Sequence, residues 1–209
     1  MRKCSAILAL AAETALAAHF FDSLGRVHLK MNEDNKFKVM QLTDLHFGEV
    51  NNSHLDHETV HFIRSLVAKE NPDFIAITGD IVSGQAWDRL QPNFWEHNYN
   101  MVAHVLEELQ VPYGIVPGYH DFEADIISSS MLDIEAKKKY AVSVPNFFEY
   151  FGNRVLHEFT YHVPIENAVT PDVVDARLWF FGTGRADCMG SGGMNCVRRD
   201  QIEWYKGQT

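Results

Sequence analysis

The sequence predicts an α/β domain in which parallel strands alternate with helices. Three short apolar runs, at 37–43, 74–78 and 113–116, are typical of strands, and helical periodicity fills the two intervals between them. Successive strands that are joined through helices pair in parallel by right-handed crossovers. The length of 209 residues fits one such domain, because two independent cores of ordinary size need a longer chain.

A β-hairpin is expected where the domain begins. The segment 26–31 alternates in polarity, the residues 32–35 form a turn-favouring cluster, and the extended run 37–43 follows. We therefore expect the two extended segments to pair with each other across this turn.

Two helices are expected between the three strands. The first covers 53–69, where apolar residues recur with helical period and Ser53 with Asp56 resembles a capping box. The second covers 94–109 and ends before a proline. The continuous apolar run between them, 74–78, is typical of a strand that is buried on both faces.

The pattern is less regular in the last third of the chain. A helix near 131–140, strands at 155–163 and 177–181, and the start of a helix at 197–206 are expected there. No internal repeat, low-complexity tract or linker marks a second domain. The domain is therefore expected to occupy residues 18–209.

The composition excludes several classes of function. Apolar residues make up 46% of the chain and charged residues 22%, which fits neither a disordered chain nor a membrane bundle. The 28 acidic and 18 basic side chains give a formal net charge of −10, which repels nucleic acid and anionic membranes. We expect no nucleic-acid partner and no stable membrane insertion, and the sequence indicates no protein partner. An anionic substrate would need a local source of positive charge.

The first residues, 1–17, have the features of a secretory signal peptide. Met1-Arg2-Lys3 carries positive charge, the run 6–12 is apolar, and Ala15-Leu16-Ala17 offers small residues at a cleavage site. A short amphipathic helix is the alternative. A signal peptide would make the protein secreted or lumenal.

Two further features matter only in such a compartment. Cys188 and Cys196 lie in one glycine-rich stretch, where they could close a disulfide loop, because thiols in an oxidising compartment tend to join. Asn51 begins the only N-x-S/T sequon and is the expected glycosylation site.

Polar clusters follow each of the three best strand candidates. Asp44 and His46 follow the first, Asp80 the second, and His120 with Asp121 the third. In open α/β sheets, the loops after the carboxyl ends of the strands converge on one crevice. These side chains are therefore expected to share a site.

The shared site has the chemistry of a metal centre. Asp44 and His46 lie two residues apart, so on an extended segment both point to one side and can reach one ion, while Asp80 can bridge to a second. Carboxylate and imidazole suit divalent zinc, manganese or iron. Two such ions activate water and neutralise a phosphoryl group, and His120 can protonate the leaving oxygen. The sequence thus predicts a phosphoesterase.

The three clusters resemble the signature of the calcineurin-like metallophosphoesterases, D-x-H, then G-D, then G-N-H-D/E. The flanking stretches 70–73 and 200–205 are similar to the purple acid phosphatase-like phosphodiesterase branch, and the resemblance covers about 37–205. It implies a four-layer α-β-β-α sandwich of two mixed sheets with helices outside. It also implies two divalent or mixed-valence transition metal ions, of iron, zinc or manganese.

The resemblance also implies a role for each site residue. Asp44 and His46 would bind the first metal and Asp80 would bridge both, while His120 would be the leaving-group acid, with Asp121 orienting it. Tyr119 stands where the family has an asparagine ligand of the second metal.

The family's late G-H-x-H segment is absent from this sequence. On the resemblance, the chain is therefore expected to be truncated at its C-terminus, lacking the second half of the fold. Two functions stay open. The protein is either a hydrolase of phosphate mono- or diesters that uses a metal-bound hydroxide, or an inactive pseudophosphatase or truncated binding form.

Two other groups of residues have less specific interpretations. The spacing of His54, His57 and His61 suits metal binding, but their helix face lies opposite the apolar stripe, which favours solvated histidines. Aromatic residues after Asp80 could line a substrate pocket or pack beneath their loop. These residues are Trp87, Phe94 and Trp95.

Overall fold

The computed structural model describes residues 19–49, 53–143, 159–170, 172–184 and 196–208. One sheet contains the three strands that were expected to be parallel. Its strands in spatial order are β3 (Val39–Leu42), β4 (Phe74–Thr78) and β5 (Tyr113–Val116). Both strand pairs are parallel, so the carboxyl ends of all three strands lie along one edge of the sheet.

The second sheet is mixed. Its strands in spatial order are β1 (His19–Phe21), β2 (Val27–Lys30), β6 (Tyr161–Glu166) and β7 (Val174–Phe180). β1 pairs antiparallel with β2, β2 pairs parallel with β6, and β6 pairs antiparallel with β7. The strands come from the two ends of the described chain, and the strands of the first sheet lie between them in the sequence.

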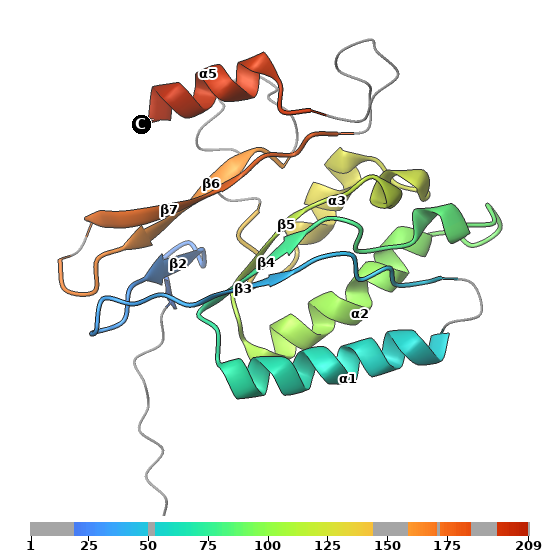
Figure 1. The fold of residues 1–209 in the computed structure, drawn as a ribbon, viewed down its shortest axis with the longest axis horizontal. Helices are drawn as coiled ribbons and strands as arrows, with labels where there is room; N and C mark the ends of the chain where they lie inside the picture. Colours follow the sequence, from blue (N-terminus) through green and yellow to red (C-terminus); the bar gives the residue numbers. More distant parts are fainter. Residues whose placement is uncertain (1–18, 50–52, 144–158, 171, 185–195, 209) are drawn as a thin grey trace, which may run out of the picture.

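Helices cover the outer faces of the two sheets. α1 (Ser53–Glu70) and α2 (Phe94–Leu109) lie against the first sheet, and α5 (Arg199–Gln208) lies beyond β6 and β7, as Figure 1 shows. α3 (Ser128–Glu135) follows β5 along the chain, and two 3₁₀ turns, η1 (Gly84–Ala86) and η2 (His120–Glu123), follow β4 and β5. The layers run helix, sheet, sheet, helix, and this confirms the predicted four-layer sandwich.

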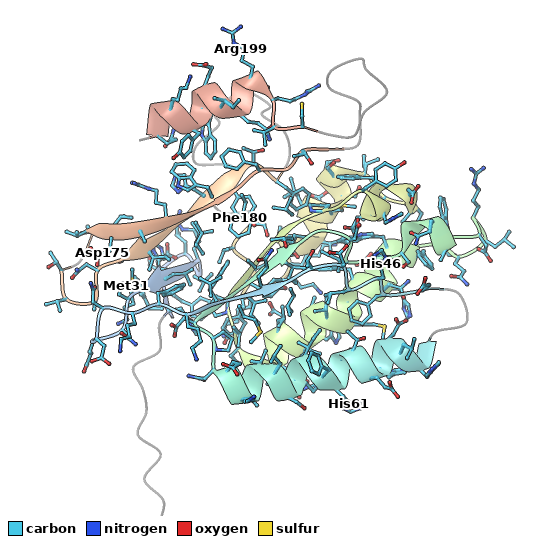
Figure 2. All side chains as sticks on the ribbon, viewed as in Figure 1. Met31, His46, His61, Asp175, Phe180 and Arg199 are labelled. Carbon is cyan, nitrogen blue, oxygen red and sulfur yellow. The ribbon has the colours of Figure 1, made fainter. Side chains whose placement is uncertain are left out.

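Aromatic side chains fill the space between the sheets. Tyr161 and Phe180, on neighbouring strands of the second sheet, stack with ring centroids 4.5 Å apart. Phe180 meets Phe74 of the first sheet edge to face at 6.3 Å, and Figure 2 shows Phe180 between the two sheets. The Tyr161 hydroxyl donates to the Ile115 carbonyl at 2.9 Å. The burial of these rings and this hydrogen bond together determine how the two sheets pack against each other.

A second aromatic cluster holds α5 on the outer face. Trp179 of β7 meets Tyr205 edge to face at 4.7 Å and Trp204 at 5.5 Å. His162 of β6 packs against Trp179 at 4.9 Å. Burial lowers the pKa of His162 to about 4, with Arg177 adding to the effect. This imidazole is therefore a neutral packing group at neutral pH.

Most of the predicted elements are present. The second helix and the third strand have the predicted bounds, and the first helix is one residue longer than expected. The helix expected near 131–140 begins and ends earlier, as α3. β6 begins at Tyr161, and residues 155–158 of the expected strand lie outside the described residues.

The predicted hairpin of 26–31 with 37–43 is wrong. The turn is present, since the Lys36 N–H donates to the Asn32 side chain at 2.8 Å and the Asn32 N–H donates to the Lys36 carbonyl at 2.9 Å. The strands on either side of it diverge into different sheets, and β2 forms its hairpin with β1 instead. The turn thus carries the chain from one layer to the other.

Asp56 acts differently from the capping-box residue that was expected. Its carboxylate accepts a hydrogen bond from the Gly48 N–H at 3.1 Å. Burial raises the pKa of this carboxyl, and the Gly48 bond opposes that shift. Gly48 has a φ of 83°, in the region that favours glycine. Asp56 therefore ties α1 to the loop that leaves β3.

Candidate metal centre

The predicted ligands meet at the carboxyl edge of the parallel sheet. Asp44 and His46 follow β3, and Asp80 follows β4. One donor atom from each of the three lies within 4.8 Å of the others. In Figure 2, His46 is at the end of the first sheet opposite to Met31, which lies before β3 begins. Adjacent parallel strands therefore deliver the two carboxylates and the imidazole to one point, as the sequence indicated. Asp44 and His46 lie beyond the end of β3 in left-handed backbone, and not on the extended segment that was expected.

All three residues have left-handed backbone. The φ angles are 54° at Asp44, 51° at His46 and 48° at Asp80. This region is sparsely populated by residues other than glycine, and such strain persists where the surroundings impose it. Here the surroundings are hydrogen bonds between the two loops, from the Asp44 N–H to the Gly79 carbonyl and from the His46 N–H to the Asp80 carbonyl, each at 3.0 Å. The loops after β3 and β4 thus brace each other.

A buried serine sets the orientation of the His46 ring. Ser83 is fully buried, and its hydroxyl donates to the His46 carbonyl at 3.2 Å and lies 3.1 Å from His46 Nδ1. With the hydroxyl proton used in this way, Nδ1–H is the donor to Ser83. Nε2 then remains for a metal, 4.0 Å from an Asp44 oxygen. A partner on the second ring nitrogen is the usual device that fixes a metal-binding histidine.

The loop after β5 closes onto Asp80. The His120 N–H donates to Asp80 Oδ1 at 2.9 Å. A Cβ added to Gly118 would lie 2.3 Å from both the Asp80 nitrogen and Oδ1, so only glycine allows the loops to approach this closely. The close approach of the Gly79-Asp80 segment to the Gly118-Tyr119-His120-Asp121 segment therefore depends on the glycine at position 118.

Asp121 is buried beneath this contact. Its Oδ1 accepts hydrogen bonds from the Val82 N–H and from Trp95 Nε1, each at 3.0 Å. Its Oδ2 accepts from the Ile81 N–H at 3.2 Å and from the Gly118 N–H at 2.8 Å. Burial raises the pKa of the Asp121 carboxyl, and the four donors oppose that shift. Asp121 clasps the loops after β4 and β5 to α2.

Asp121 does not make the contact with the His120 ring that the resemblance implied. The carboxylate that holds the imidazole is Glu123, whose Oε2 lies 2.7 Å from His120 Nδ1. The His120 ring also lies close to the three ligands, with its centroid 5.4 Å from that of His46. Asp121 supports the backbone, and Glu123 contacts the His120 side chain.

Tyr119 lies beside His120. It is 37% exposed, and its ring meets that of His120 edge to face at 5.4 Å. A neutral phenol is a weaker ligand for a divalent ion than the amide oxygen of the family's asparagine. A bulky, partly exposed aromatic ring therefore lies beside His120, at the sequence position of the family's asparagine ligand.

For His54, His57, His61 and Trp95, the structure favours the alternatives to a functional role. His54, His57 and His61 are exposed on α1, and Figure 2 shows His61 on the far side of the first sheet from α5. Trp95 is fully buried and stacks on Tyr99 at 4.6 Å, so it packs beneath the site and does not line a pocket.

Other predictions fall wholly or partly outside the described residues. Cys196 is disulfide-bonded, but the predicted partner Cys188 lies outside them. Asn51 and the segment 1–17 also lie outside them. Within the described ranges, no helix has the length and apolar character that crossing a membrane requires.

Sequence reasoning missed two residues of the site. Ser83 could not be identified from the sequence, because a serine three residues after an aspartate is common in loops. Glu123 had a signal, the spacing H-x-x-E, which is meaningful only when the segment is known to be helical.

A comparison with protein families matches residues 37–203 to the calcineurin-like phosphoesterases. The matched region takes in all three polar clusters and ends within α5. It covers well over half of the chain, and it includes both β-sheets apart from β1 and β2.

Comparison with curated proteins finds distant relatives. Probable inactive purple acid phosphatase 14 of Arabidopsis thaliana is 28% identical over 58% of this chain and 31% of its own length. Probable inactive purple acid phosphatase 28 of the same plant is 24% identical over 85% of this chain and 49% of its own. Phosphatase DCR2 of Saccharomyces cerevisiae is 26% identical over 56% of this chain and 22% of its own length. The chain thus spans less than half the length of each of these relatives.

Proposed function

We propose, since the chain belongs to the calcineurin-like phosphoesterase family, that it hydrolyses phosphate mono- or diesters with bound transition metal ions. The observation that carries this proposal is the meeting of Asp44, His46 and Asp80, whose donor atoms lie within 4.8 Å of one another. Metal-assisted phosphoester hydrolysis requires metal ligands and, beside them, a group that can transfer a proton.

The donor set fits a transition metal. It combines two carboxylates with an imidazole, a mixture that suits iron, zinc and manganese. The Asp44 side chain is 62% exposed, so an ion can enter, and Asp80 Oδ2 accepts no hydrogen bond from the described residues. Asp44 and His46 would hold the first ion and Asp80 would bridge to a second. Bound metal ions supply positive charge that activates water and neutralises the phosphoryl group.

His120 supplies the proton in this proposal. Its ring lies beside the three ligands, and its backbone N–H is fixed to Asp80. With Nδ1–H directed to Glu123, Nε2 is the nitrogen left for an ester, and the imidazolium form of the ring would give its Nε2 proton to the leaving oxygen and become neutral. The surrounding protein surface is acidic, with a net charge of −10, so substrate is attracted by the site and not by the surface at large.

A second candidate is a binding protein without hydrolytic activity. Tyr119 favours it, because the phenol replaces a ligand of the second metal. Two relatives also carry the word inactive in their names. A pseudophosphatase would keep Asp44, His46 and Asp80 as a single metal site and bind phosphorylated groups without cleaving them.

Hydrolysis of p-nitrophenyl phosphate and of bis-p-nitrophenyl phosphate separates the two functions. The chain is assayed after chelation and again with added manganese, zinc or iron, beside Asp80→Asn and Tyr119→Asn. The exposed Asp133→Asn on α3 is the matched control, because it removes the same charge away from the site. We expect metal-dependent turnover that Asp80→Asn abolishes and Tyr119→Asn raises. Metal binding without turnover in any variant supports the pseudophosphatase and refutes the hydrolase.

We also propose that residues 1–17 are removed as a signal peptide, that 18–209 form the phosphoesterase domain, and that the protein is secreted or lumenal. The disulfide at Cys196 supports this, because such bonds persist in oxidising compartments. N-terminal sequencing of the protein from its own cells gives the test. A mature chain that still begins at Met1 would refute the cleavage.

A further inference from the structure

His120 and Glu123 form a close side-chain pair on η2. The Nδ1 atom of His120 lies 2.7 Å from Oε2 of Glu123. The pair is three residues apart in a 3₁₀ turn, where residues i and i+3 lie one above the other. The two side chains are 33% and 22% exposed, so solvent screens the pair only in part. The backbone conformation itself therefore brings the carboxylate to the ring.

The backbone beneath the pair is held from two sides. The His120 N–H is bonded to Asp80, as described above. From the other side, η1 packs directly on η2, because a Cβ added to Gly84 would lie 2.1 Å from the His120 carbonyl oxygen and 3.0 Å from the Glu123 carbonyl carbon. The backbone that carries the ring and the carboxylate is thus held by both neighbouring loops.

Glu123 has no competing structural role among the described residues. Its carboxylate makes no ion pair with a lysine or arginine there, and His120 is its hydrogen-bonding partner. The amino end of α2 is capped by Asp125, which accepts hydrogen bonds from the Phe94 and Trp95 N–H groups at 2.9 and 3.0 Å. The neighbouring acid, Asp121, is fully engaged with other donors. The contact of Glu123 with His120 is therefore its principal one.

We propose that Glu123 is a positioning residue, which holds the imidazole of His120 with Nδ1–H toward the carboxylate and Nε2 toward the phosphoester. This inference rests on the proposed function. A carboxylate on one ring nitrogen selects the tautomer and fixes the ring angle, so the other nitrogen is aimed before substrate arrives. Loss of Glu123 frees the ring to rotate and leaves either nitrogen protonated.

The kinetic test compares esters that differ in their need for a proton. An alkyl phosphate must release an alkoxide, whereas p-nitrophenyl phosphate releases a stable anion. We expect Glu123→Ala to lower kcat for the alkyl ester by about tenfold and for the p-nitrophenyl ester by less than about twofold, with KM unchanged, because general acid catalysis serves the poorer leaving group. Glu123→Gln keeps an acceptor oxygen at the same place and should fall between Ala and the native protein.

A double-mutant cycle shows whether Glu123 acts through His120. In a His120→Asn background, Glu123→Ala should change kcat by less than about twofold, since the ring that it positions is gone. Glu33→Gln is the matched control, because Glu33 is exposed in the turn before β3, at the opposite end of that strand from the site. Equal losses for both esters, or losses that add in the double variant, would overturn the proposal.

Nitrogen NMR of the metal-free chain tests the positioning without catalysis. In alkaline solution, where a neutral imidazole carries one N–H, the native His120 should show a protonated Nδ1. Glu123→Ala should shift both ring nitrogens toward a mixture of tautomers. A native ring that is protonated on Nε2, or shifts that Glu123→Ala leaves unchanged, would refute the inference. If no ester is hydrolysed with any metal, the hydrolase proposal fails, and these spectra still decide whether Glu123 positions the ring.

Discussion

The clasp formed by Asp121 makes a quantitative prediction for Asp121→Asn. Each carboxylate oxygen accepts two hydrogen bonds, and the donors are the backbone N–H groups of Ile81, Val82 and Gly118 together with Trp95 Nε1. Asparagine has the same shape but offers one oxygen and one NH₂ group. In either orientation of the amide, the NH₂ group faces two of the four donors, which then have no acceptor.

The cost follows from those two donors. A buried donor without a partner costs about 1–3 kcal/mol, so Asp121→Asn should lower the free energy of unfolding by roughly 2–6 kcal/mol. Single domains are stable by about 5–15 kcal/mol, which makes this a large share of the total. Urea unfolding, followed by tryptophan fluorescence, measures the change from the midpoint and slope.

The exposed substitution Asp133→Asn is the control and should stay within about 0.5 kcal/mol of the native protein. If Asp121→Asn does not fold, Trp95→Phe replaces it as the test. That substitution removes one donor and leaves the carboxylate three, so its hydrogen-bonding cost should be near 1 kcal/mol. A loss below about 1 kcal/mol for a folded Asp121→Asn would refute the assignment of a clasp.

Three further substitutions probe other contacts. Gly118→Ala should weaken manganese binding by at least about tenfold in calorimetry, because its Cβ would lie 2.3 Å from Asp80 Oδ1 and displace that ligand. Gly114→Ala should destabilise the fold by about 1–3 kcal/mol in urea, because its Cβ would lie 2.7 Å from the Tyr161 hydroxyl between the sheets. Burial raises the pKa of Glu135 to about 7, so its contribution to stability is complete below its unfolded pKa near 4.5 and is lost as the pH rises through 7. Glu135→Gln should remove that loss, which urea midpoints at pH 5 and pH 8 measure.

Each of these tests has a clear contrary result. Gly207→Ala is the control for both glycine substitutions, since no atom lies within 4 Å of its added Cβ. Equal metal affinity in Gly118→Ala, or equal stability in Gly114→Ala, would show that the loops or the sheets can move apart at little cost. A pH dependence that Glu135→Gln leaves unchanged would assign the titration to another group.

The first sheet could be predicted from the sequence because its signals are local. Each strand of that sheet is a short apolar run, each crossover is a helix with its own periodicity, and the handedness of crossovers leaves one arrangement. The site followed from the sheet, because Asp44, His46 and Asp80 stand immediately after strands whose ends must lie side by side. No long-range information was needed for this part.

The second sheet could not be predicted in the same way. β2 pairs with β1 and β6, and its register with β6 joins Leu29 to Ile165, far along the chain. No local pattern near 26–31 indicates that β2 pairs with β6. The turn that follows β2 instead suggested pairing with the next extended segment, 37–43, and the structure does not form that pair. The contact of Glu123 with His120 was missed for a related reason, since it depends on the 3₁₀ turn η2, which packs against η1 from another part of the chain.

The braced loops after β3 and β4 bear on how the protein acquires its metal. Backbone hydrogen bonds between the two loops hold Asp44, His46 and Asp80 in left-handed conformations, so the protein's own backbone positions these three side chains. An arriving ion then has little chain to immobilise, and a departing ion leaves the architecture intact. We therefore expect that a chelator would remove a bound ion without unfolding the chain, so that one metal could replace another in the folded protein.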